Sequence, residues 1–185
     1  MGFFFLGLAI IVLVSMGMYN YLIGKKNQVE NVFSSVDVIL KQRYDIIPNL
    51  VATAKAYMTH ERETLEKIAQ WRSQALKGDL DTNTKMQLDG KISQALGGVM
   101  VAVENYPELK ANENFLHLQY TLNELEENIA AARRAYNRSV TDYNNALEMF
   151  PTNIMAGFME LKPGELFEAP QNDRVNVDVS SLLKR

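Results

Sequence analysis

The sequence predicts an all-α protein in which an N-terminal transmembrane helix continues into an antiparallel up-and-down bundle of three to four long helices. An uncharged apolar stretch opens the chain, apolar residues then recur at steps of three and four, and strand-like alternation is confined to 175–179. With 185 residues, 47% hydrophobic and 22% charged, the composition is that of a folded protein. Four parts are expected: an anchor (1–24), a helical bundle (25–150), a membrane-proximal apolar segment (151–168) and a flexible C-terminal tail (169–185).

The first part predicts a membrane-spanning helix that contacts the lipid bilayer through residues 2–24. This stretch carries no charged side chain and is rich in Phe, Leu, Ile and Val. Its length as a helix is roughly 34 Å at about 1.5 Å per residue, which covers a hydrocarbon core of about 30 Å. At about −0.3 to −0.6 kcal/mol per large apolar residue, insertion is favourable by several kcal/mol.

Two other interpretations of this segment fit less well. A cleaved signal peptide requires a basic region before a shorter apolar stretch, although Ser15-Met16-Gly17 offers small residues at cleavage spacing. A lipid anchor requires a cysteine or a myristoylation motif, whereas the chain has no cysteine and carries Leu6 where that motif has Ser or Thr. Because Lys25 and Lys26 follow the span at once, the positive-inside rule places the N-terminus outside and the bundle in the cytoplasm.

Four helical segments are expected after the span. The first continues directly from it to about Met58, and Thr59 is a candidate N-cap for the second, which ends near Gly78 as a C-cap. The third covers about 84–105, where Gly97-Gly98 predicts a close approach to a neighbouring helix. Asn112 or Asn114 is expected to cap the last helix, which has the strongest 3.6-residue period and ends before Pro151.

The order of these helices predicts where the next segment lies. If the first helix leaves the membrane, two shorter ones go down and up, and the last long helix returns to the bilayer. The segment that follows would then contact lipid headgroups or a membrane partner, or else fold back over the end of the bundle. Its candidate membrane-proximal residues are Phe150, Ile154, Phe158, Leu166 and Phe167.

The sequence offers little support for catalysis, a metal or a cofactor. A net charge of −3 argues against nucleic-acid binding, and the absence of cysteine excludes thiolate chemistry. His60-Glu61 begins like a zinc-protease motif, but Thr64 stands where the second histidine is required. No P-loop, dinucleotide turn or nucleophile elbow is present. We therefore expect no catalytic residue, no metal ligand and no cofactor.

Two polar clusters lie beside the apolar stripes of long helices. We expect them either to lock helices together inside the bundle or to form a partner-binding surface. Pro48 removes the N–H that would bond the Tyr44 carbonyl, which predicts a kink. Neighbouring polar side chains are expected to satisfy that carbonyl and to bridge toward Arg133 and Asn137. The candidate residues are Arg43, Asp45, Pro48 and Asn49 in the first cluster, and Arg133, Tyr136, Asn137, Tyr143 and Asn144 in the second.

Several motifs in these regions resemble the LemA family of bacterial proteins. They are RYDIIPNL at 43–50, YPELKANENF at 106–115 and ARRAYN at 132–137, followed by Tyr143-Asn144 and Phe150-Pro151. The likeness covers about residues 1–168 in the order and spacing of the family. It implies a single-pass protein of the bacterial inner membrane with a bundle of long antiparallel helices, and it implies no reaction.

The resulting hypothesis is a membrane-anchored scaffold or adaptor that presents a bundle surface to unidentified membrane or cytoplasmic proteins. A self-associating protein that organises or remodels membrane is the first alternative, and it would form a homo-oligomer. A hydrolase that uses carboxylates is the second. No nucleic-acid partner is expected.

Overall fold

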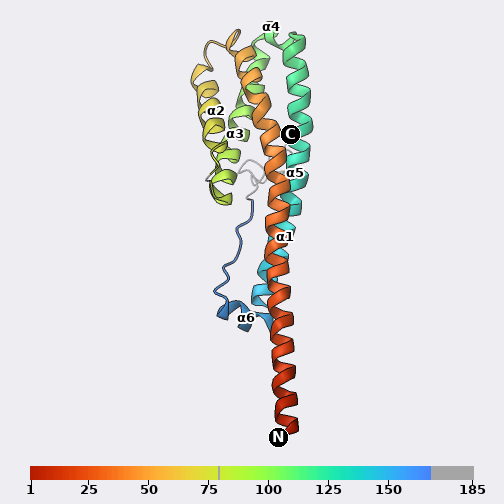
Figure 1. The fold of residues 1–185 in the computed structure, drawn as a ribbon. Coiled ribbons are helices and arrows are strands. Elements are labelled where there is room, and N and C mark those ends of the chain that lie inside the picture. Colours follow the sequence, from red (N-terminus) through yellow and green to blue (C-terminus); the bar gives the residue numbers. More distant parts are fainter. Residues whose placement is uncertain (79, 168–185) are drawn as a thin grey trace, which may run out of the picture.

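A computed structural model describes residues 1–78 and 80–167 of the chain (Figure 1). Within these ranges it has helices and no strand, which confirms the predicted all-α class. The predicted tail at 169–185 lies outside the described residues. The elements are α1 (Gly2–Lys55), α2 (Arg62–Ala75), α3 (Thr82–Ala102), the 3₁₀ turn η1 (Val103–Asn105), α4 (Pro107–Lys110), α5 (Glu113–Glu148) and α6 (Thr152–Phe158).

The helices alternate in direction (Figure 1). The long helices α1 and α5 run antiparallel and pack side by side, and the shorter hairpin of α2 and α3 packs against them. The hairpin covers only the half of this pair that is distant from the N-terminus. Beyond the end of α5, α6 lies beside the N-terminal half of α1.

One apolar core joins the four main helices. Leu40, Ile47 and Leu50 of α1 are fully buried at helical spacing, and they belong to the same cluster as Ile92 of α3 and Ile129 of α5. A second, smaller cluster joins Leu22 to the end of α5 and to α6. Burial of one stripe per helix is what the 3.6-residue period predicts.

The helix ends agree with the sequence only in part. The Asn112 side chain accepts a hydrogen bond from the Phe115 N–H at 3.0 Å, which confirms Asn112 as a cap. Asp81, which we did not predict, caps α3 in the same way at 2.9 Å. Thr59 is not a cap, because α2 begins after Glu61. Gly78 is not one either, because the helix ends at Leu76 in a right-handed conformation that any residue adopts.

Helix α1 continues without a break through Pro48, and its distal half leans toward α2 (Figure 1). The Tyr44 carbonyl, which has lost its usual N–H partner, accepts a hydrogen bond from Nε of Arg72 on α2 at 2.5 Å. The prediction that Asp45 and Asn49 satisfy it is wrong. Both are exposed together with Pro48 because they lie outside the buried stripe of α1.

The predicted close approach at Gly97-Gly98 is also wrong. Both glycines are exposed on α3, and a Cβ atom added at either position meets nothing within 4 Å. Packing therefore gives no reason for glycine at these positions.

Replacing these two glycines is expected to stabilise the bundle. The double variant Gly97→Ala, Gly98→Ala should raise the free energy of unfolding by about 1–2 kcal/mol, because alanine loses less backbone entropy in a helix. Urea unfolding in detergent, followed by the fluorescence of the single Trp71, measures the change. Gly164→Ala is the contrasting control, because its Cβ would lie 3.2 Å from Cγ1 of Val140. Equal or lower stability of the double variant would contradict the prediction.

Candidate functional site

The most concentrated polar site is a buried charge network between α1, α3 and α5. Arg43 of α1 donates to the Asp89 carboxylate of α3, and Arg133 of α5 donates to the other oxygen of the same carboxylate. Nη1 of Arg43 also donates to Oγ of Ser93 and to Oε2 of Glu126, each at 2.8 Å. Arg43 and Asp89 are both 0% exposed, and these bonds take the place of water for all but Nε of Arg43, which is buried without a partner.

The four charges of this network balance. Two guanidinium groups meet two carboxylates, which offsets the large cost of removing each charge from water. Burial lowers the pKa of Arg43, and the nearby Glu126 carboxylate acts in the opposite direction. Burial also lowers the pKa of Arg133. Arginine nevertheless remains cationic in proteins, so both guanidinium groups keep their positive charge.

The sequence indicated the two arginines but not their acidic partners. Asp89 was missed although it lies in the buried stripe of α3, three residues before Ile92 and one after Leu88. A lone carboxylate at an apolar stripe position was the available signal, since a buried charge requires a partner. Glu126 gave no such signal, because its side chain is half exposed and resembles the other acids of α5.

A second polar site holds the chain that follows α6. The Asn137 amide accepts from the Phe167 N–H at 2.8 Å and donates to the Phe167 carbonyl at 3.0 Å. Asn144 makes the same pair of bonds with Gly164, at 2.8 and 3.0 Å. Tyr143 adds a hydrogen bond from its hydroxyl to the Lys162 carbonyl at 3.2 Å. We call residues 161–167 the C-terminal strap.

The spacing of the two asparagines matches that of an extended chain. Seven helical residues from Asn137 to Asn144 advance about 10.5 Å, and three extended residues from Gly164 to Phe167 advance about 10 Å. Each asparagine therefore meets one peptide unit of the strap. The strap runs antiparallel to α5, over the part of the α1–α5 pair that the α2–α3 hairpin leaves uncovered (Figure 1).

An aromatic cluster fixes the end of the strap. The Tyr136 ring packs edge-on against Phe167, with ring centres 5.2 Å apart, and against Phe33 of α1 at 5.6 Å. The Arg133 guanidinium lies 5.5 Å from the centre of the Phe167 ring. The prediction that Phe167 contacts the membrane is therefore wrong, whereas Leu166 is 46% exposed and its membrane contact stays a prediction. Asn137 holds this end of the strap beside the bundle, where Phe167 is buried.

The other residues predicted to lie near the membrane lie at the same end of the molecule as the N-terminal apolar span. Phe150, Ile154 and Phe158 are 79%, 54% and 83% exposed. They border or belong to α6, which packs on α1 through Ala156 and Met155.

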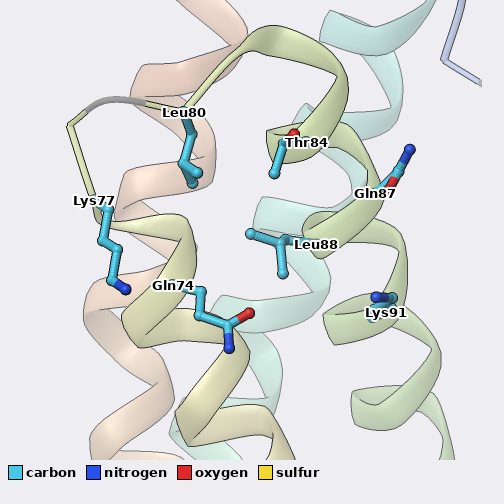
Figure 2. Close-up of a pocket in the computed structure, with 7 residues that line it drawn as sticks. All are labelled: Gln74, Lys77, Leu80, Thr84, Gln87, Leu88 and Lys91. Carbon is cyan, nitrogen blue, oxygen red and sulfur yellow. The ribbon is translucent and has the colours of Figure 1, made fainter.

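A groove lies in the α2–α3 hairpin. Figure 2 shows a groove of about 270 Å³ between the end of α2 and the start of α3, where Leu80 and Leu88 point toward the space between the helices. Lys77 and Lys91 lie on its two sides, and Gln74, Thr84 and Gln87 complete the lining. Among the described residues, no group of three or more His, Asp or Glu side chains is arranged to hold a metal ion.

Comparison with known proteins identifies the family. The model of the LemA family matches residues 32–180. The chain belongs to the LemA family. Protein LemA of Metamycoplasma hominis is 31% identical over 180 residues, which cover 97% of this chain and 82% of that protein.

Magnetosome proteins match part of this LemA family chain. MamQ 2 of Paramagnetospirillum magneticum is 35% identical over 86 residues, and MamQ of Magnetospirillum gryphiswaldense is 34% identical over the same length. In each case the match covers 46% of this chain and 32% of the relative. The family and the long apolar helix at the N-terminus fit a membrane anchor.

Removal of Arg43 is expected to destabilise the bundle strongly. Arg43→Met should lower the free energy of unfolding by about 3–5 kcal/mol, because it leaves buried carboxylate oxygens without their partner. The control is Lys110→Met, which removes an exposed ion pair with Glu104 and should cost less than about 1 kcal/mol. Urea unfolding followed by Trp71 fluorescence compares the two. Equal costs would show that the network contributes no more than a surface ion pair.

Removal of Asn144 is expected to release the strap. Asn144→Ala should cost about 1–2 kcal/mol, since two hydrogen bonds of about 1 kcal/mol each are lost. It should also speed amide hydrogen exchange at Gly164. Asn145→Ala is the matched control, because Asn145 is exposed on the same turn of α5. Unchanged exchange at Gly164 in the Asn144 variant would contradict the role given to these bonds.

Proposed function

We propose that this protein is a membrane-anchored scaffold or adaptor that holds its bundle upright on the membrane and presents the bundle surface to other proteins, without catalysis. The observation that carries the proposal is the continuity of α1, a single helix of 54 residues. At about 1.5 Å per residue it is roughly 81 Å long. Anchor and bundle are thus parts of one rigid element.

The junction between anchor and bundle supports this arrangement. Lys25 follows the apolar span and lies 3.9 Å from Asp142 near the end of α5. Leu22 is fully buried against Tyr143 and Leu147 of the same helix. Because α5 packs on α1 down to this level, the bundle is supported at its base. We propose that its far end is held about 46 Å from the membrane, the length of the 31 residues from Lys25 to Lys55.

We place the partner-binding surface at that far end. The two polar clusters suggested by the sequence are poor candidates, because Arg43, Arg133, Asn137 and Asn144 are engaged in contacts within the chain. Val101, close to the end of α3, is 74% exposed. Leu116 and Tyr120, on the first turns of α5, are 46% and 72% exposed. Exposed aromatic and aliphatic side chains are what binding surfaces use as anchors.

The positive charges that follow the span support a bundle on the cytoplasmic side of the membrane. Lys25 and Lys26 follow the span directly, and such a pair favours the cytoplasmic side of the bacterial inner membrane. The partners proposed here are therefore cytoplasmic proteins or the cytoplasmic parts of membrane proteins.

Site-specific photocross-linking in cells tests the proposal. A photoreactive amino acid at Tyr120 should give adducts with other proteins, whereas the same group at the exposed polar position Gln94 of α3 should not. A second variant, Val101→Asp, should reduce the Tyr120 adducts several-fold while leaving the amount of protein unchanged. Adducts of the mass of two copies of the chain would instead favour the self-associating alternative. Equal labelling at both positions, or none at either, would contradict the adaptor proposal.

A further inference from the structure

The position of α6 along α1 gives its height relative to the bilayer. The side chains of Ser15, Met16, Tyr19 and Asn20 line a groove of about 390 Å³ together with Met155 of α6. Ala156 of the same helix packs in the cluster that buries Leu22. Figure 1 shows α6 beside this part of α1. The helix therefore lies level with about residues 15–22 of α1.

The same residues belong to the membrane span. A hydrocarbon core of about 30 Å requires about 20 helical residues. The uncharged stretch runs to Gly24 and Lys25 follows it, so a span of this length that reaches this boundary includes residues 15–21. These residues then lie in the leaflet next to the bundle, within about 15 Å of its boundary, because each residue advances about 1.5 Å.

Side chains that mark membrane interfaces lie at this level. Tyr19 and Tyr21 are about half exposed on α1, at 49% and 50%, and aromatic residues of this kind collect at the headgroup boundary. Lys25 and Lys26 follow within two turns. The boundary of the leaflet therefore lies between about residues 19 and 25, and α6 reaches below it.

The chemistry of the segment fits this depth. Residues 149–159 carry no charged side chain, while Glu148 and Glu160 stand directly at its two ends. Phe150 and Phe158 are 79% and 83% exposed, and Ile154 is 54% exposed. In water these side chains would expose a large apolar face to solvent, which is unfavourable. In a membrane leaflet the same face would contact lipid, which is favourable.

The backbone at the start of the segment is also suited to a dry environment. Helix α5 ends before Pro151, which has no N–H to donate to the carbonyls of the last turn. The Thr152 hydroxyl lies 2.6 Å from the Ala146 carbonyl and 2.8 Å from the Met149 carbonyl, within reach of both acceptors. Such side-chain partners matter most where water does not reach.

We propose that residues 149–159 form a foot embedded in the leaflet next to the bundle, with Phe150, Ile154 and Phe158 in contact with lipid acyl chains. The foot makes a second contact between the protein and the bilayer, beside the span. It lies at a depth of about 5–10 Å, as interfacial helices do. This inference rests on α1 crossing the membrane and not on the binding of a protein partner.

Single-cysteine labelling measures this depth directly, because the chain contains no native cysteine. The full-length variants Ile154→Cys and Phe158→Cys carry an environment-sensitive nitrobenzoxadiazole label in vesicles of phosphatidylethanolamine and phosphatidylglycerol. Leu8→Cys serves as a reference inside the span, and Tyr120→Cys as a reference in water. All four positions are exposed on the protein, so labelling does not disturb the core. Lipids with a nitroxide at a shallow or a deep acyl position act as quenchers.

The expected result is a blue-shifted emission at positions 154 and 158, with several-fold stronger quenching than at position 120. The shallow nitroxide should quench these two labels more than the deep one. Labels at 154 and 158 that emit and quench like the one at 120 would place α6 in water and overturn the foot. Cross-linking from Tyr120 tests the adaptor function separately. The foot and the adaptor function can therefore be disproved independently of each other.

Discussion

The arrangement of the bundle depends on one carboxylate, Asp89, which lies between two guanidinium groups in the interior. Apolar contacts between helices are non-directional, and the short α2–α3 hairpin meets a much longer α1–α5 pair along which many heights would bury similar area. A buried charge differs, because separating it from its partners costs several kcal/mol of folding free energy. At the observed height of the hairpin, Asp89 pairs with both Arg43 and Arg133. We therefore expect the network to select the register of the hairpin, as buried polar groups fix register in coiled coils.

Fixing the hairpin at this height leaves the lower part of the α1–α5 pair to be covered by something else. The strap covers it, and its extended form follows from its sequence, because Pro163 and Gly164 disfavour helix. An extended backbone needs hydrogen-bond partners for its peptide groups, and Asn137 and Asn144 supply both a donor and an acceptor for one unit each. The polar residues of α5 thus serve the backbone of the strap, while Arg133 links the strap to the charge network through Phe167.

Sequence patterns predicted the helices well because their signals are local. The period of apolar residues located α1, α3 and α5, and Asn112 was predictable because a capping side chain bonds to its own helix. Contacts between different helices were harder to predict from the sequence. Arg72 satisfies the Tyr44 carbonyl from another helix, and no spacing within α1 indicates it. The apolar character of Phe167 suggested the membrane equally well as the core, and the bonds from Asn137 that decide between them depend on the tertiary fold.

If α1 crosses the membrane as proposed, its unbroken helix would couple the orientation of the span to that of the bundle. Single membrane spans tilt by about 20° on average, and the tilt responds to bilayer thickness. A helix without a hinge transmits that tilt to everything attached to it. Over about 46 Å of helix beyond the membrane, a tilt of about 20° moves the far end sideways by roughly 16 Å. Changes in membrane thickness would therefore be converted into displacements at the opposite end of the bundle.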